Sequence, residues 1–439
     1  NVDEKRAKME KINKSDAPFS KAYCRFFLGL CRFVRPFLHG VCKKSKSFKR
    51  QKKNGAMLIV CNHLSAYDFI HFSSAMYGAP LNFVVAENMM YSMPIFGSYH
   101  AITKKQYFAD LACIKNIKKY LDQGISVLIC PEGKVSANGV TGAIAPSIAR
   151  LVQWLGYPVG VIKMQGASLA RPKWAYNLRF VRRGRVVTNC DMLFTKEEAK
   201  SLSKEEIYQK ICDALYQNEH KWQVENGIIF KGSRYAEGLD RLLYRCPKCG
   251  SEFEMSSSGS HLKCNRCGND VVYGYDGRLV PQGDGVCPER IDLWYDEQRA
   301  LVAKEVQNGD FKLSNTVNLF VENELNNGYR FVANGVLTLD KDKLCFDTDW
   351  QERPVGVKSK YGVNNMSLDF DTANGTEKVE DEFKHVEFAV SRCDTVANLP
   401  GSAVDMYDDK HVYRFMFDKV MAATKYALCI EEAYKLGKK

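Results

Sequence analysis

A short polar segment, NHLSAYD at residues 62–68, constrains this chain more than any other feature. It follows the apolar run Ala56–Cys61, which predicts a buried strand. On one regular helix, His63 and Asp68 would lie roughly 140° apart and would not meet. They meet if His63 lies in the turn after the strand and Asp68 begins the next helix. A histidine oriented by a carboxylate in this way is a general base for a hydroxyl group.

Strands and helices alternate after this segment. Helices are predicted over 68–77, 109–123, 144–155 and 203–220, and strands over 81–85, 125–130, 157–162, 176–181 and 185–192. The alternation predicts an α/β fold with a mixed, largely parallel sheet at residues 56–240. In such sheets the site lies at the carboxyl ends of the strands.

A second polar segment, PEGKVS at residues 131–136, directly follows the strand predicted at 125–130. A lone Pro-Glu-Gly is more often a turn than a site, but its place at a second strand end pairs it with NHLSAYD. The stretch 88–97 is rich in Met and aromatic residues, which suits either a groove for a hydrocarbon chain or a plain core loop.

Together, the two segments resemble motifs of the glycerolipid acyltransferase family typified by 1-acyl-glycerol-3-phosphate acyltransferases. The first family motif is complete at Asn62, His63, Ser65 and Asp68. The third, Pro-Glu-Gly-Thr-Arg-Ser in the family, matches at Pro131, Glu132, Gly133 and Ser136. It differs at Lys134 and Val135. The second and fourth motifs are matched loosely at 101–106 and 158–162, and the whole resemblance covers about residues 55–220.

The resemblance implies an O-acyltransferase in which His63, oriented by Asp68, deprotonates an acceptor hydroxyl. The alkoxide would attack the thioester of acyl-CoA or acyl-carrier protein directly, and no Gly-x-Ser-x-Gly elbow offers a serine nucleophile instead. Substrate-binding residues would be Asn62, Ser65, Lys104, Lys105, Glu132, Gly133 and Lys134.

The acceptor is less constrained than the chemistry, because Val135 replaces the family arginine that contacts the acceptor phosphate. Lys104, Lys105 or Lys134 would supply a point charge instead, without the bidentate hydrogen bonds that arginine forms with a phosphate. The acceptor is then either a lysophosphatidate held by lysine, or another lysophospholipid or a glycolipid that lacks a terminal phosphate. For Lys104 and Lys105, a solvated strand end is the alternative.

The N-terminal arm, residues 1–55, is strongly basic. It holds 16 Lys and Arg against four acidic residues, an excess equal to the net charge of +12 of the whole chain. Apolar residues recur with helical spacing from Tyr23 to Val41, which predicts an amphipathic helix kinked at Pro36. A basic run at 43–53 follows.

An aromatic stripe beside a basic run is typical of a helix that lies on an anionic membrane. A core helix with a solvated linker is the alternative. Nucleic acid fits less well, because bulky apolar side chains read neither bases nor phosphates. We find no signal peptide and no apolar run of about 18 residues. The sequence therefore predicts a peripheral or monotopic protein on the cytoplasmic face of a membrane.

Two C-x2-C-G pairs, separated by 14 residues, predict a zinc ribbon at residues 241–288. Its ligands would be Cys246, Cys249, Cys264 and Cys267. Four thiolates leave no open position, so the zinc would be structural, and an iron site is the alternative for the same ligands. The single cysteines in apolar runs, such as Cys61 and Cys130, indicate core residues in a reducing compartment.

The last part of the chain, residues 289–439, is predicted as a β-rich accessory domain. Helices are expected over 289–306 and 418–434, with strands over 317–321, 329–332, 336–339, 344–347, 385–390 and 411–417. Residues 351–383 read as a polar loop. The order of these elements, several strands followed by one C-terminal helix, loosely resembles a pleckstrin-homology-like or GRAM-like barrel.

A zinc-ribbon nucleic-acid-binding protein with a basic arm is the rival function for the whole chain. It leaves the polar segments at 62–68 and 131–136 unexplained. The sequence carries no signal for an oligomeric state.

Overall fold

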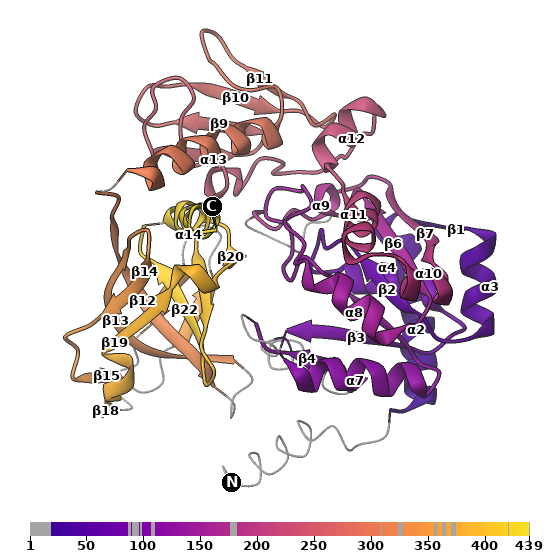
Figure 1. The fold of residues 1–439 in the computed structure, drawn as a ribbon. Helices are drawn as coiled ribbons and strands as arrows, with labels where there is room; N and C mark the ends of the chain where they lie inside the picture. Colours follow the sequence, from indigo (N-terminus) through magenta and orange to yellow (C-terminus); the bar gives the residue numbers. More distant parts are fainter. Residues whose placement is uncertain are drawn as a thin grey trace. The chain divides into compact units, whose positions relative to one another are not determined.

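The computed structural model shows two compact units (Figure 1). It describes residues 19–86, 89, 96, 99–106, 110–175, 182–308, 310–323, 328–354, 358–361, 366–369, 375–419 and 421–438. The described parts of 1–172 and 181–231 form the first unit, and those of 173–180 and 232–439 form the second. The strand predicted over 176–181 and most of the stretch 88–97 lie outside the described residues.

A seven-stranded sheet forms the centre of the first unit, in the order β1-β7-β6-β2-β5-β3-β4. The strands are β1 (Gly40–Lys44), β2 (Leu58–Cys61), β3 (Leu81–Ala86), β4 (Ile102–Lys104), β5 (Ser126–Ile129), β6 (Val159–Gln165) and β7 (Val186–Phe194). Neighbouring strands are parallel except for β6 and β7. The predicted mixed, largely parallel α/β sheet is confirmed. The central strand β2 is buried at every position, as its unbroken apolar run requires.

Helices connect these strands as the alternation predicts. They are α4 (Asp68–Met76), α7 (Leu111–Asp122), α8 (Ser147–Leu155), α9 (Ala167–Ala170), α10 (Lys196–Ser201), α11 (Lys204–Leu215) and α12 (Glu219–Glu225). The single helix predicted over 203–220 is wrong at its end. It breaks after Leu215, because the Gln217 backbone N–H binds the Thr141 hydroxyl at 2.9 Å and Asn218 caps a new helix.

The N-terminal region differs from the predicted kinked helix. Helix α2 (Lys21–Val34) ends in a 3-10 turn, η1 (Arg35–Leu38), that contains Pro36. The chain then enters the sheet as β1, parallel to β7, and continues into α3 (Lys46–Asn54). The proline ends the helix rather than kinking it. Helix α2 and strand β1 both lie in the first unit, and the boundary of the basic arm at residue 55 stays a prediction.

The described residues of the second unit form two larger sheets, two short two-stranded ribbons and two long helices. An antiparallel ribbon, in the order β11-β10-β9-β8, comprises β8 (Met255–Ser258), β9 (His261–Cys264), β10 (Asp270–Tyr273) and β11 (Leu279–Pro281). A seven-stranded antiparallel sheet comprises β12 (Leu313–Asn323), β13 (Gly328–Leu339), β14 (Lys343–Asp347), β19 (His385–Ala389), β20 (Ala397–Leu399), β21 (Ala403–Tyr407) and β22 (Val412–Phe417). The long helices are α13 (Ile291–Gln307) and α14 (Ala422–Leu436).

Residues 351–383 are not the plain loop that their polarity predicts. Strand β15 (Glu352–Pro354) pairs with β18 (Thr376–Lys378), and β16 (Lys358–Tyr361) pairs with β17 (Met366–Asp369). Such short polar ribbons lack the alternating apolar positions that reveal a half-buried strand. The likeness to a pleckstrin-homology-like or GRAM-like barrel stays a prediction.

Candidate active site

Three loops meet at one edge of the first sheet because β5, β2 and β6 are neighbouring parallel strands. The loop after β2 carries the 62–68 segment and lies in the middle. The loop after β5 carries the 131–136 segment on one side, and the loop after β6 leads into α9 on the other. This edge is where α/β sheets place their sites.

His63 and Asp68 contact one another as predicted. The His63 Nδ1 lies 3.0 Å from the Asp68 Oδ2, and the same oxygen accepts hydrogen bonds from the backbone N–H groups of Leu64 at 2.7 Å and Ser65 at 3.0 Å. Helix α4 begins at Asp68, which is 1% exposed, whereas the His63 side chain is 28% exposed. Because Nδ1 faces the carboxylate, Nε2 is the ring nitrogen left for a substrate hydroxyl.

Glu132 fixes the backbone of His63 rather than facing an open pocket. One carboxylate oxygen accepts from the His63 N–H at 2.9 Å and the other from the Gly142 N–H at 2.7 Å. Glu132 is 3% exposed. The carbonyl of His63 accepts from the Ser136 N–H at 2.8 Å. The 131–136 segment therefore fixes the backbone of His63, and the predicted substrate-binding role of Glu132 stays a prediction.

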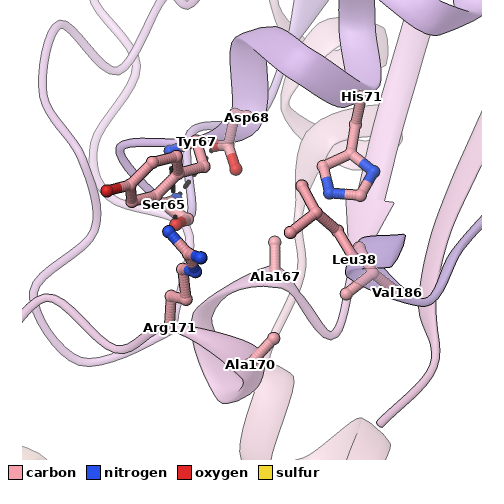
Figure 2. Close-up of a pocket in the computed structure, with 9 residues that line it drawn as sticks. All are labelled: Leu38, Ser65, Tyr67, Asp68, His71, Ala167, Ala170, Arg171 and Val186. Carbon is pink, nitrogen blue, oxygen red and sulfur yellow. Dashed lines mark hydrogen bonds between the residues drawn. The ribbon is translucent and has the colours of Figure 1, made fainter. Parts of the chain in front are cut away.

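The side chain of Asn62 also bonds to backbone groups, and its predicted substrate-binding role stays a prediction. Its side-chain amide exchanges two hydrogen bonds with the Met164 backbone, at 2.9 Å and 2.8 Å, and is fully buried. These bonds tie the end of β2 to β6. Ser65 is 4% exposed; its hydroxyl accepts from the Tyr67 N–H at 3.4 Å and it lines a small pocket beside Asp68 (Figure 2).

The other predicted binding residues lie toward the β4 side of the edge. Lys104 ends β4 and donates to the Lys105 carbonyl at 3.3 Å. Gln106 donates to the carbonyl of Gly133 at 3.3 Å, which brings this segment to the 131–136 loop. Gly133 is exposed with φ of +70°, and Lys134 follows it. These residues share one edge with His63, but no described contact joins a lysine side chain to the His63–Asp68 pair.

The charges around His63 stabilise its protonated form. Desolvation disfavours the imidazolium, but the nearby Cys130 sulfur, the hydrogen bond and charge of Asp68, and Glu132 together raise the pKa of His63 to about 9. Burial raises the pKa of Glu132 to about 7, against two backbone N–H bonds that lower it. A base with a raised pKa gains strength but is neutral in a smaller fraction of molecules at pH 7.

Replacing Asp68 with asparagine is expected to move the pH profile of the site to lower pH. In the native protein, kcat/KM for the His63-dependent reaction should rise as pH increases through about 9, because only neutral imidazole accepts a proton. Loss of the carboxylate lowers the pKa of His63, so the rise begins earlier and reaches a lower plateau. Asp347→Asn, which removes the carboxylate 2.6 Å from the exposed His385, is the matched control. An unchanged midpoint in Asp68→Asn would contradict the pairing.

Sequence reasoning missed several residues that complete the site. Gly142 and Met164 act through their backbones, so their side-chain types carry no signal. Arg171 follows α9, and its guanidinium carbon lies 3.9 Å from the centre of the Tyr67 ring. The two residues are 104 positions apart, and nothing in the spacing around Arg171 indicates a contact with residue 67.

The four predicted metal ligands form a cluster in the second unit. The sulfur atoms of Cys246, Cys249, Cys264 and Cys267 all lie within 4.8 Å of one another. The two Sγ–Sγ distances of 3.6 Å and 3.8 Å fit the separation of about 3.8 Å that tetrahedral zinc with 2.3 Å bonds requires. Gly250 and Gly268, at φ of +73° and +72°, let the backbone turn beneath each pair.

Comparison with known proteins supports an acyltransferase domain in the first unit. Residues 42–164 match the family model described as Acyltransferase. The structure is similar to that of the 1-acyl-sn-glycerophosphate (LPA) acyltransferase PlsC from Thermotoga maritima, with 14% sequence identity and a TM-score of 0.36. That match covers 44% of this chain and 76% of the other. No curated protein matches the sequence.

Proposed function

We propose that this protein is an O-acyltransferase of glycerolipid synthesis. It moves a fatty acyl group from acyl-CoA or acyl-carrier protein to the hydroxyl of a lysoglycerolipid, with 1-acyl-glycerol-3-phosphate as the leading acceptor. The observation that carries this proposal is the His63–Asp68 contact of 3.0 Å at the sheet edge, inside the stretch that matches the acyltransferase family.

The geometry supports direct transfer. Nε2 of His63 takes the proton of the acceptor hydroxyl while Asp68 stabilises the imidazolium on the other side of the ring. The alkoxide attacks the thioester carbonyl, the carbon–sulfur bond breaks, and the thiolate leaves with the proton returned by His63. Glu132 and Ser136 keep the His63 backbone in place during both proton transfers.

A panel of acceptors tests the proposed function. The full chain is given labelled acyl-CoA or acyl-carrier protein together with lysophosphatidate, lysophosphatidylcholine, a glycolipid or monoacylglycerol. The proposal predicts a diacyl product, formed fastest from lysophosphatidate. Faster transfer to an acceptor without a terminal phosphate would show that the acceptor is another lysophospholipid or a glycolipid. No product from any acceptor would overturn the function.

Helix α2 supports docking on an anionic membrane. One face packs Cys24, Phe27 and Cys31 into the core, so part of the predicted stripe is core. The other face leaves Phe26 and Phe33 at 68% exposure, and Phe37 in the turn η1 is 70% exposed; the basic helix α3 follows β1. Exposed aromatic residues beside basic ones are typical of an interfacial helix. No helix in the described parts of the chain has the length and hydropathy to cross a bilayer. We therefore propose a peripheral or monotopic protein on the cytoplasmic face.

The double variant Phe26→Ser, Phe33→Ser is expected to reduce binding to anionic vesicles at least about tenfold, because each ring loses apolar burial in the lipid. Co-sedimentation with vesicles that contain phosphatidylserine measures this. Both side chains are exposed, so the fold should be retained. Leu111→Ser, at an equally exposed apolar side chain in the same unit, is the control. Equal sedimentation of the double variant and the control would remove α2 from the membrane contact.

We also propose that the cysteine cluster binds a structural Zn²⁺. All four donors are cysteine sulfurs, which leaves no ligand position for a substrate. The cluster lies in the ribbon, which contacts α13. The Trp294 Nε1–H donates to the Arg245 carbonyl, and the Gln298 side-chain oxygen accepts from the Arg245 N–H. The zinc would therefore hold the ribbon in shape within the second unit.

A further inference from the structure

Arg171 places a guanidinium group beside the His63–Asp68 pair. It lines the pocket that Ser65, Asp68 and His71 also line, and its guanidinium lies over the Tyr67 ring (Figure 2). Tyr67 is the residue directly before Asp68. The stacking holds the planar group flat and leaves its edge available for hydrogen bonds.

Strand order puts the loop that carries Arg171 next to the loop that carries His63. Arg171 follows β6, which neighbours β2, and lies on the side of β2 opposite to Glu132. Lys104 ends β4 and Lys105 follows it, and β4 is three strands from β2, or roughly 14 Å across the sheet. Of Arg171, Lys104 and Lys105, Arg171 therefore lies in the loop closest to the one that carries His63.

Among the described residues, no carboxylate forms an ion pair with the Arg171 guanidinium. None of the ion pairs between described residues includes Arg171, and its buried Nε has no hydrogen-bond partner among them. A partly buried charge without a partner is costly, so its retention is explained by an anion that arrives with the substrate. Asp68 lines the same pocket, but no ion pair among the described residues joins it to Arg171. Its Oδ2 is bonded to His63 and two backbone N–H groups, and its buried Oδ1 has no hydrogen-bond partner among them.

We propose that Arg171 binds the phosphate of the acceptor and makes the enzyme specific for lysophosphatidate. Two parallel N–H bonds from one guanidinium match the oxygens of a phosphate monoester. Arg171 would thus supply, from the opposite side of His63, the arginine that is missing at Val135. The inference rests on the proposed function, since it names the acceptor of the same site.

Two measurements test this proposal in the full chain. Glycerol 3-phosphate, but not glycerol, should raise the melting temperature of the native protein, and Arg171→Ala should lose that shift. In turnover with acyl-CoA, Arg171→Ala should lower the ratio of kcat/KM for lysophosphatidate to that for monoacylglycerol by about ten- to a hundredfold. Arg171→Lys should recover part of the ratio, and Arg185→Ala, at an exposed arginine in the same unit, should leave it unchanged.

Other outcomes separate this inference from the proposed function. An equal loss with both acceptors would show that Arg171 only supports Tyr67 and would overturn the inference. A raised KM for acyl-CoA in place of the acceptor would assign the group to the donor phosphates and would also overturn it. If the phosphate-dependent thermal shift disappears in Arg171→Ala but no acceptor is acylated, the anion site stands and the proposed function fails.

Discussion

Replacing His63 with alanine is expected to slow acyl transfer by about 10²- to 10⁴-fold, the range that a general base contributes. Without the imidazole, no described side chain in contact with Asp68 can take the proton of the acceptor hydroxyl. Asp68 keeps its bonds from Leu64 and Ser65, so the loop should retain its shape. The rate constant kcat is measured at saturating acceptor and donor, where a binding defect has no effect.

A second histidine–carboxylate pair provides the control. His385 lies 2.6 Å from Asp347 on the surface of the second unit, with 61% of its side chain exposed. His385→Ala removes the same chemical pair and should leave kcat unchanged. Residual activity of His63→Ala within a few-fold of the native value would exclude His63 as the base. The melting temperature of both variants shows whether a loss comes from unfolding.

Loss of the metal is expected to destabilise the second unit strongly. Structural zinc contributes on the order of 10–16 kcal/mol of apparent binding energy in small cysteine sites at pH 7, and this energy is linked to folding. The ribbon supplies Glu252 to the buried Lys425 of α14 at 2.7 Å, and α13 supplies Glu305 at 2.8 Å. When the ribbon unfolds, Lys425 loses one of these partners. The double variant Cys246→Ser, Cys267→Ser should therefore unfold at a lower temperature.

Cys287→Ser is the matched control, because Cys287 lies near the ribbon but outside the cluster. Calorimetry of the metal-loaded, chelator-treated and variant proteins measures the transitions, and elemental analysis should find one zinc per chain. Equal transitions with and without the metal would contradict a structural role. Complete loss of acyl transfer in a metal-free protein that remains folded would contradict a purely structural metal.

The parts of the site that were predictable are those formed by neighbouring residues. Five positions separate His63 from Asp68, so a strand end and a helix start bring them together with little help from the rest of the fold. The C-x2-C-G pairs are local in the same way. Two buried strands that end in polar segments also fix which edge of the sheet carries the chemistry.

Long-range contacts were not predictable from the sequence. The stacking of Arg171 on Tyr67 depends on the order of β6 and β2 in the sheet, which no local pattern encodes. Asn62 and Glu132 belong to the expected motifs, but their buried contacts with distant backbone groups carry no signal in the sequence. The strand β1 was missed because its basic sequence, GVCKK, lacks the apolar run of a buried strand and sits at the edge of the sheet.

The most direct test of the central claim counts both products of one reaction. The full chain is mixed with acyl-CoA and lysophosphatidate, and free thiol and diacyl product are measured over time. The account predicts equal amounts of thiol and diacyl product, both dependent on the acceptor, with no acyl group left on the protein in its intact mass spectrum. Thiol release without the acceptor, or a covalent acyl-protein that forms and decays, would contradict direct transfer by His63.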